Sequence, residues 1–426
     1  MTSRRKFIGG AAALAAGSAL AGCVTPTPPR KTLGRVMVIG AGFGGATCAK
    51  YLRLWSGGAI EVMLVDRDPM FVSCPGSNMV LSGVRSMAEI SHSRNKLREY
   101  GIQVLNDEVT EVDTAKRIVK FRDRYADMGY DRLVMSPGVD FLYDQIPGLN
   151  NAKAQARFLH AWKAGVETMA LRSQLEAMRD GGVFIISVPR APYRCAPGPY
   201  ERACQVAFYF RKAKPRSKIV ILDANEDITS KPALFRAAWN ELYKGMIDYQ
   251  PNAEVVDVDL AGSAVKTDFD TVKGDVINVL PPMAAATIAR STGLINANNR
   301  WCNVDWLSME STAIKGIHVL GDATLSAPVM PKSGHMANQH GKLAAAAIVE
   351  IMNGRAPNPD PVVANTCYSF ASDVEAMHVA SVHHYDATQK TLVPVSGAGG
   401  LSARRSEAEG VYGWAWAQNI WAEMLT

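Results

Sequence analysis

The most constraining feature of the chain is a glycine-rich turn between an apolar strand and a helix. Residues 35–39, Arg-Val-Met-Val-Ile, predict a buried strand that runs into Gly-Ala-Gly-Phe-Gly-Gly at residues 40–45. Gly40 permits the tight turn, Gly42 lets the backbone approach a pyrophosphate, and Gly45 lets the helix pack closely on the strand. The helix that follows then points its N-terminus at the phosphates. This order of strand, turn and helix predicts a dinucleotide-binding unit.

A second strand supports this prediction. Residues 60–65 form an apolar run that ends at Asp66. A carboxylate roughly 20 residues after the glycine turn is the usual partner of a ribose hydroxyl. Asp66 is therefore predicted to bind the ribose of the same nucleotide.

Two later segments indicate that the nucleotide is FAD. Residues 130–138 predict a strand and turn that return the chain to the nucleotide domain, and residues 316–323 predict a strand that ends in Gly-Asp. The second segment resembles the flavoprotein motif in which an aspartate, here Asp322, binds the ribityl chain. The Lys332 side chain, at the start of the next helix, is expected either to face the flavin pyrimidine and favour an anionic reduced form or to be a solvated loop lysine.

A second βαβ unit lacks the glycine motif. Residues 183–188 and 218–223 predict strands on either side of a helix that runs through residue 210. The connecting loop, residues 189–202, is rich in proline and carries Cys195. Proline has no N–H, so this loop is not expected to cradle a pyrophosphate. Nicotinamide is therefore not predicted to be the reductant.

The N-terminus has the pattern of an export signal. Arg4, Arg5 and Lys6 precede a short Gly/Ala/Leu run over residues 9–22. Paired arginines before such a run predict the twin-arginine route, so we expect a periplasmic protein that folds around a cofactor before export. The run ends at Cys23 in a sequence that resembles a lipoprotein cleavage box. Both a lipid-anchored form and a soluble released form remain open.

The charge of the chain excludes one class of partner. The formal net charge of +6 falls to +3 when the three basic residues leave with the signal. So small a charge indicates no nucleic acid or other polyanion as a partner. No cysteine and histidine spacing typical of a zinc site occurs, so no metal site is predicted.

The later motifs resemble those of the flavoprotein subunit of flavocytochrome c sulfide dehydrogenase. The resemblance runs from about residue 34 to the C-terminus, and its most specific pieces are residues 194–203, 330–334 and 365–369. In that family a cysteine after the second strand of the flavin domain forms a thioether to the flavin 8α-methyl group. Cys74 occupies that place, so the resemblance implies covalent FAD at Cys74.

The resemblance also implies a reaction. It places a redox-active disulfide between Cys195 and Cys367, and Glu201 as a carboxylate that moves a proton near that bond. Sulfide would be oxidised to sulfur or polysulfide, with electrons passing through FAD to a c-type cytochrome. The haem belongs to that partner, because no Cys-x-x-Cys-His motif occurs in this chain.

The implied architecture is an α/β fold with two Rossmann-like domains of the disulfide-reductase type and a small C-terminal domain. The expected segments are an export signal and linker, a discontinuous FAD domain, a second Rossmann-like domain and a cytochrome-interface domain. The export signal and linker cover residues 1–32, and the discontinuous FAD domain covers residues 33–148 and 272–352. The second Rossmann-like domain covers residues 149–271, and the cytochrome-interface domain covers residues 353–426. Trp414, Trp416 and Trp421 in the last segment fit either the partner surface or the domain's own core.

Three rival functions remain open. A sulfide:quinone reductase shares the two-domain plan, but an exposed apolar C-terminal segment would be expected in it. An NAD(P)H-dependent disulfide reductase is disfavoured by the missing second glycine motif and by the absence of a close cysteine pair in the flavin domain. A non-catalytic flavoprotein partner of a sulfur-oxidising complex is the third.

Overall fold

The glycine turn joins two parallel strands and a helix, as its spacing predicts. In the computed structural model, which describes residues 32–426, β1 (Gly34–Ile39) leads into α1 (Phe43–Trp55) and then β2 (Ile60–Asp66). β1 and β2 pair in parallel from Gly34 opposite Ile60 to Ile39 opposite Val65. The predicted export signal and Cys23 lie outside the described residues.

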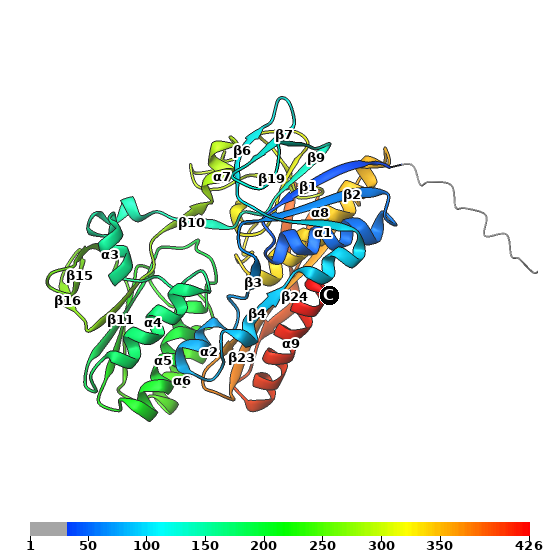
Figure 1. The fold of residues 1–426 in the computed structure, drawn as a ribbon. Helices are drawn as coiled ribbons and strands as arrows, with labels where there is room; N and C mark the ends of the chain where they lie inside the picture. The colour runs from blue at the N-terminus through cyan, green and yellow to red at the C-terminus, as the bar shows by residue number, and fades with distance from the viewer. Residues whose placement is uncertain (1–31) are drawn as a thin grey trace, which may run out of the picture. The chain divides into compact units, whose positions relative to one another are not determined.

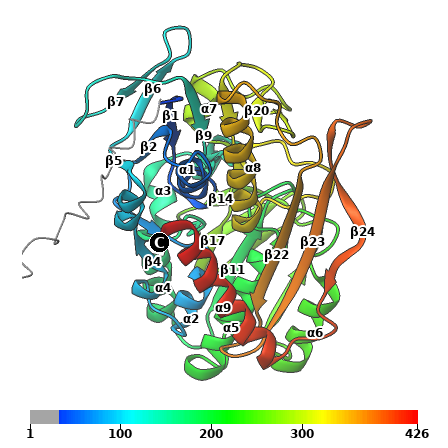
Figure 2. The ribbon, with the colours of Figure 1, turned by 90° about the vertical axis from the view of Figure 1, so that its right-hand side faces the viewer.

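The first sheet gathers strands from both ends of the described chain. Its order is β19-β20-β21-β9-β1-β2-β5, so the strand next to β1 on one side comes from a later stretch. Helices α1 and α8 (Gly334–Met352) lie side by side against this sheet (Figures 1 and 2). The remaining strands of the sheet are β5 (Ile102–Asn106), β9 (Arg132–Met135), β19 (Val304–Asp305), β20 (Glu310–Ser311) and β21 (Ile317–Val319).

The second sheet has the order β13-β12-β11-β17 and is parallel throughout. Its strands are β11 (Val183–Val188), β12 (Lys218–Asp223), β13 (Ile247–Gln250) and β17 (Val276–Val279). The helices of this part are α3 (Ala152–Arg157), α4 (Val166–Ala177), α5 (Gly198–Ala213) and α6 (Pro232–Leu242). The sheet extends past the predicted boundary at residue 271, because the buried strand β17 pairs with β11.

The C-terminal part is an antiparallel sheet covered by a helix. Strands β22 (Val362–Phe370), β23 (Ala376–Asp386) and β24 (Thr391–Leu401) pair in sequence order. Helix α9 (Glu407–Leu425) lies beside this sheet and also contacts α1 (Figure 2). Within the described residues, two Rossmann-like sheets and this antiparallel domain confirm the predicted fold class.

Short elements connect these parts, and Leu33–Thr426 forms one compact unit. Between residues 32 and 426, no helix combines the length and apolar character needed to cross a bilayer. The short helices are α2 (Ser77–Ser82) and α7 (Thr287–Ser291). The short strands are β3 (Met70–Val72), β4 (Ser91–Ser93), β6 (Val109–Asp113), β7 (Ile118–Phe121), β8 (Met128–Gly129), β10 (Val139–Phe141), β14 (Val255–Asp259), β15 (Ala264–Thr267), β16 (Thr271–Lys273) and β18 (Met283–Ala285).

Candidate functional site

A cavity of about 1240 Å³ collects residues from all three parts of the fold. Its wall contains every residue predicted for the site except Gly45 and Lys332. Those predicted residues are Gly40, Gly42, Asp66, Cys74, Cys195, Glu201, Asp322 and Cys367. The fold therefore brings together positions that span almost the whole described sequence.

The glycine turn forms one end of the cavity and fits a pyrophosphate. Gly40 has a φ of +90°, and a Cβ on it would collide with the Ser136 carbonyl oxygen. A Cβ on Gly45 would collide with the Gly40 carbonyl oxygen, so Gly45 sets how closely α1 approaches β1. A Cβ on Gly42 would meet no atom within 4 Å and would project into open space. The open position at the N-terminus of α1 is the kind of cradle that phosphate oxygens fill.

Two aspartates line the cavity, and they differ in whether their carboxylate oxygens have hydrogen-bond partners. Asp66 accepts a hydrogen bond from the Ala41 amide at 2.7 Å and pairs with Arg94 at 3.3 Å. In Asp322, by contrast, the Oδ1 atom is buried and has no hydrogen-bond partner. A buried acceptor without a partner is uncommon, and a hydroxyl of a bound ligand would satisfy it. The Asp322 site therefore fits the ribityl hydroxyl that the sequence motif predicts.

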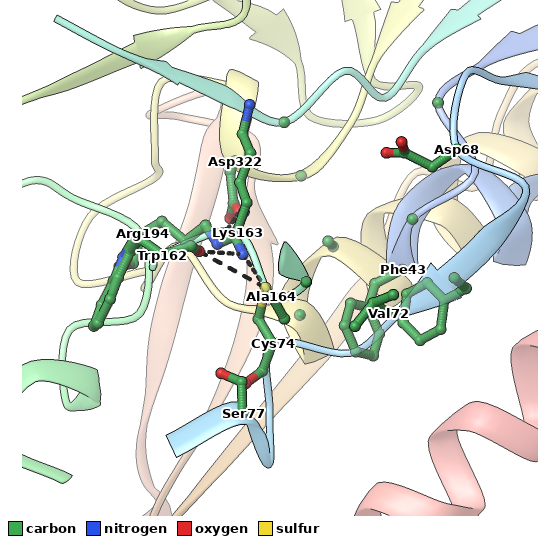
Figure 3. A pocket seen from close by; sticks show the side chains of 18 of the residues that line it. Phe43, Asp68, Val72, Cys74, Ser77, Trp162, Lys163, Ala164, Arg194 and Asp322 are labelled. Carbon is green, nitrogen blue, oxygen red and sulfur yellow. Dashed lines mark hydrogen bonds and ion pairs between the residues drawn. The ribbon is translucent and has the colours of Figure 1, made fainter. Parts of the chain in front are cut away.

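Cys74 lies against Arg194, a half-buried arginine that sequence reasoning missed. Arg194 donates from Nη2 to the Cys74 sulfur and, at 2.9 Å, to the Trp162 carbonyl oxygen (Figure 3). The Trp162 indole N–H donates back to the Arg194 carbonyl oxygen at 2.9 Å. On its other side the guanidinium is 3.8 Å from Asp322. The available signal was the position of Arg194 directly beside Cys195.

Cys195 is held in an unusual backbone conformation in the loop just before α5. Its φ is +63°, its amide donates to the Lys332 carbonyl oxygen at 2.9 Å, and its carbonyl oxygen accepts from the Gly198 amide at 2.9 Å. A Cβ on Gly198 would lie 2.9 Å from the Cys195 sulfur and 2.6 Å from the Trp162 ring. Glycine at 198 therefore leaves room for the sulfur.

Cys367 belongs to β22 and lines the same cavity as Cys195. All six cysteines within residues 32–426 are free thiols, so the predicted Cys195–Cys367 disulfide is not formed in this structure. Burial raises the pKa of both thiols, and the charges of Glu201 and Cys367 raise that of Cys195 further. Both thiols line the same cavity, and their pairing as a disulfide stays a prediction.

Glu201 and a buried lysine flank the two thiols. The Glu201 carboxylate accepts hydrogen bonds from the Phe370 amide and from Asn78, both at 2.8 Å, and burial raises its pKa. Lys231 donates to the Cys367 carbonyl oxygen at 3.1 Å and to Ser369 at 2.8 Å. Burial lowers the pKa of Lys231 to about 8, against the opposing effect of the Cys367 and Glu201 charges. Nothing in the local sequence around Lys231 pointed to this position.

The solvated alternative for Lys332 is wrong, whereas its contact with the flavin stays a prediction. Its side chain is buried, lies over the Trp301 ring at 3.7 Å, and donates to the carbonyl oxygens of Asp322 and Thr324. It does not line the cavity, and it is not a solvated loop lysine. The reason is packing, because the ammonium group supplies the donors for two carbonyl oxygens of the preceding loop and leaves only its backbone facing Cys195.

The C-terminal tryptophans divide between two environments. Trp421 is buried in the chain's own core, where its indole N–H donates to Ser73 at 3.0 Å and its ring packs on His92. Trp414 and Trp416 line the cavity instead. Among residues 32–426, no cluster of His, Cys, Asp and Glu side chains is arranged to hold a metal ion.

Three family models match successive stretches of this chain. Residues 34–169 match a pyridine nucleotide-disulphide oxidoreductase model. Residues 168–281 match the central part of the sulfide dehydrogenase (flavocytochrome c) flavoprotein chain. Residues 359–425 match the flavin-binding part of flavocytochrome c sulphide dehydrogenase.

Individual relatives show the same similarities. The sulfide dehydrogenase (flavocytochrome c) flavoprotein chain of Chlorobaculum thiosulfatiphilum is 54% identical over 46 residues, which cover 11% of this chain and 94% of that sequence. The mitochondrial sulfide:quinone oxidoreductase of Dictyostelium discoideum is 23% identical over 309 residues, which cover 69% of this chain and 66% of that protein. This chain therefore spans slightly less than two thirds of the length of the Dictyostelium protein.

A solved structure shares the fold over most of its length. The sulfide:quinone oxidoreductase from Aquifex aeolicus superposes with a TM-score of 0.71 at 18% sequence identity, and the match covers 92% of this chain and 91% of that chain. At this identity the likeness shows the arrangement of elements rather than the chemistry.

Proposed function

Because the chain belongs to the flavocytochrome c sulfide dehydrogenase flavoprotein family, we propose that it oxidises sulfide to sulfur or polysulfide and passes the electrons through FAD to a c-type cytochrome. The observation that carries the proposal is the single cavity that holds the glycine turn, Asp322, Cys195 and Cys367. A nucleotide site and a pair of thiols in one cavity suit electron transfer between sulfur and a flavin.

Residues that line the cavity suit the successive parts of an FAD molecule. The turn at Gly40 and Gly42 and the N-terminus of α1 would bind the pyrophosphate, and Asp66 would bind the ribose. Asp322 would accept from a ribityl hydroxyl, and Cys74 would form the thioether. When bound, FAD supplies the capacity to accept two electrons together and release them singly.

The two thiols, joined as a disulfide, would perform the sulfur chemistry. Hydrosulfide attacks one sulfur, the Cys195–Cys367 bond breaks, and the products are a persulfide on one cysteine and a thiolate on the other. A second hydrosulfide removes the outer sulfur as hydrodisulfide and leaves a thiol. The thiol then gives up its proton and the disulfide re-forms with the loss of two electrons, for which a bound FAD would be the acceptor.

Glu201 is the proton acceptor in this scheme. Its charge acts on Cys195, and burial raises its pKa, so it exchanges a proton more readily near neutral pH than an exposed glutamate does. It would take the proton that leaves a thiol when the disulfide re-forms.

The partner and the compartment complete the proposal. The family name includes a c-type cytochrome, and this chain has no Cys-x-x-Cys-His motif, so we assign the haem to a separate subunit. The twin-arginine pattern supports a periplasmic location, with Cys23 as the point of a lipid anchor if one is present.

A second candidate acceptor is a quinone. The sequence similarity to the Dictyostelium sulfide:quinone oxidoreductase favours it. Turnover with sulfide, followed in parallel with cytochrome c and with a soluble quinone, separates the two. Faster reduction of the quinone would replace the cytochrome in our proposal.

An anaerobic titration of the flavin-loaded protein tests the reaction itself. We expect sulfide to bleach the flavin absorbance and NADH to leave it unchanged. In Cys195→Ser and Cys367→Ser, sulfide should no longer bleach the flavin although the flavin content stays the same. Cys302→Ala is the matched control, because Cys302 is a buried thiol that does not line the cavity. Bleaching by NADH alone, or by sulfide in both serine variants, would refute the mechanism.

A further inference from the structure

We propose that Arg194 activates Cys74 for its covalent attachment to the flavin, by holding the Cys74 sulfur as a thiolate. This inference rests on the proposed thioether at Cys74. It assigns to Arg194 a task separate from sulfide oxidation, because the bond to the flavin has to form before the first turnover.

The contact between the two side chains is direct. The Arg194 Nη2 atom donates to the Cys74 sulfur, and both groups line the cavity that holds the nucleotide-binding turn. Figure 3 shows the Arg194 side chain beside Trp162, with a dashed line from it to the Cys74 sulfur. Only a thiolate is an effective nucleophile, and a neighbouring cation favours that form.

The charges around Arg194 point the same way. Arginine stays protonated even when buried, and a buried cation needs a counter-charge. The guanidinium forms one ion pair, with Asp322 at 3.8 Å. A thiolate at Cys74 supplies a second counter-charge that is in hydrogen-bond contact. The largely desolvated charge of Arg194 therefore stabilises the reactive form of the cysteine.

The guanidinium is also fixed in position. Arg194 Nη2 donates to the Trp162 carbonyl oxygen, and the Trp162 indole donates to the Arg194 carbonyl oxygen. Arg202 lies over the Trp162 ring at 4.6 Å and donates to the Ala161 carbonyl oxygen at 2.7 Å. These contacts prevent Arg194 from swinging out to solvent, so its charge stays on Cys74.

The chemistry balances with a named oxidant. The flavin 8α carbon loses a proton, and the Cys74 thiolate uses a sulfur electron pair to form a C–S bond to that carbon. This bond formation reduces the flavin ring system by two electrons. Dioxygen, or the one-electron acceptor of the proposed function, then removes those electrons. Arg194 does not enter the bond changes, so it is a positioning residue.

The test measures flavin that stays with the polypeptide after acid precipitation. Arg194→Gln and Arg194→Lys are purified with bound FAD, incubated at about pH 7 and at about pH 9.5, and compared by intact mass and flavin fluorescence. In Arg194→Gln we expect the covalent fraction at the lower pH to fall at least about tenfold. It should recover at the higher pH, where a free thiol with a pKa of about 8.5 ionises unaided.

Two further variants serve as controls for the effect of Arg194→Gln. Arg194→Lys keeps a positive charge and should show an intermediate covalent fraction. Arg190→Gln removes an exposed arginine of the same loop, paired with Glu254 at 2.7 Å, and should behave like the unaltered protein.

The outcomes separate this inference from the proposed function. Full coupling in Arg194→Gln at about pH 7, coupling equally poor at both pH values, or loss of FAD binding altogether would each overturn the role of Arg194. Cys74→Ala reports on the attachment site alone. If that variant retained covalent flavin, or if the unaltered protein had none, the proposed thioether at Cys74 would be wrong whatever Arg194 does.

Discussion

His160 illustrates how burial decides the charge of a single side chain. Its Nδ1 atom accepts a hydrogen bond from the Trp162 amide at 2.9 Å, and its ring stacks on Phe141 with the ring centres 3.9 Å apart. Burial lowers the pKa of His160 to about 3. The ring is therefore uncharged at neutral pH. At that pH the 3.1 Å contact between His160 Nδ1 and Glu167 Oε2 is not an ion pair.

Neutral buried histidines predict that the protein loses stability in mild acid. Burial lowers the pKa to about 3 for His340 and to about 4 for His318, as it does for His160. The unfolded chain takes up protons below about pH 6.5 while the fold does not. The free energy of unfolding is therefore highest above that pH and falls as the pH drops towards the folded-state pKa values.

Each such histidine contributes a slope of up to about 1.4 kcal/mol per pH unit. Denaturant unfolding at several pH values between about 7.5 and 5 measures this slope. His160→Gln should show a shallower slope than the unaltered protein. A free energy of unfolding that stays constant over this range would contradict the assignment of neutral histidines.

At the scale of an element, the turn between β1 and α1 contains glycines that are needed for two different reasons, the packing of the fold and the binding of a phosphate. Gly45 is required by the protein itself, because a Cβ at this position would collide with the Gly40 carbonyl oxygen. Gly42 faces open space and has a φ of −80°, which any residue can adopt. The fold alone therefore does not require glycine at 42, whereas a bound pyrophosphate would.

This contrast gives a pair of matched substitutions. Gly42→Ala should fold with the stability of the unaltered apoprotein but bind FAD at least about tenfold more weakly, because its methyl group occupies phosphate space. Gly45→Ala should lower the stability of the apoprotein by more than about 1 kcal/mol, since backbone has to move. Thermal unfolding without FAD and flavin titration measure both effects. Equal flavin affinity in Gly42→Ala would remove this turn from the cofactor site.

Across the whole Leu33–Thr426 unit, the site depends on contacts between distant stretches of chain. Glu201 in α5 joins Asn78 of α2 to the Phe370 amide of β22. Trp421 in α9 holds Ser73, the neighbour of Cys74, through a 3.0 Å hydrogen bond. The C-terminal domain thus supports the segment that carries the proposed flavin attachment.

Removing the Trp421 side chain should therefore weaken both the fold and the cofactor site. Trp421→Ala is expected to cost about 3–5 kcal/mol of unfolding free energy, and Trp421→Phe, which loses mainly the hydrogen bond, about 1 kcal/mol. Both are measured by denaturant unfolding, with flavin content determined on the same samples. Tyr412→Ala on the same helix is the control, because Tyr412 is 60% exposed. A loss below about 1 kcal/mol in Trp421→Ala would show that α9 does not support the Cys74 segment.

The sequence by itself determined the features that depend on local physics. Apolar strands of the right length and a glycine turn specify a βαβ unit, since strand burial and collisions around a glycine involve residues close in the chain. Asp66 follows from its place at the end of the second strand, and Asp322 from the resemblance of its Gly-Asp segment to a flavoprotein motif. The family motifs also located Cys74, Cys195, Glu201 and Cys367, all of which the cavity brings together.

Only the tertiary structure decided which side chains face one another. It turned Lys332 into the core, placed Arg194 on Cys74 across 120 positions of sequence, and brought Lys231 to Cys367. It also assigned β17 to the second sheet. These outcomes depend on which buried donors and charges lack a partner once the three parts of the fold have packed, and no local pattern of residues records that.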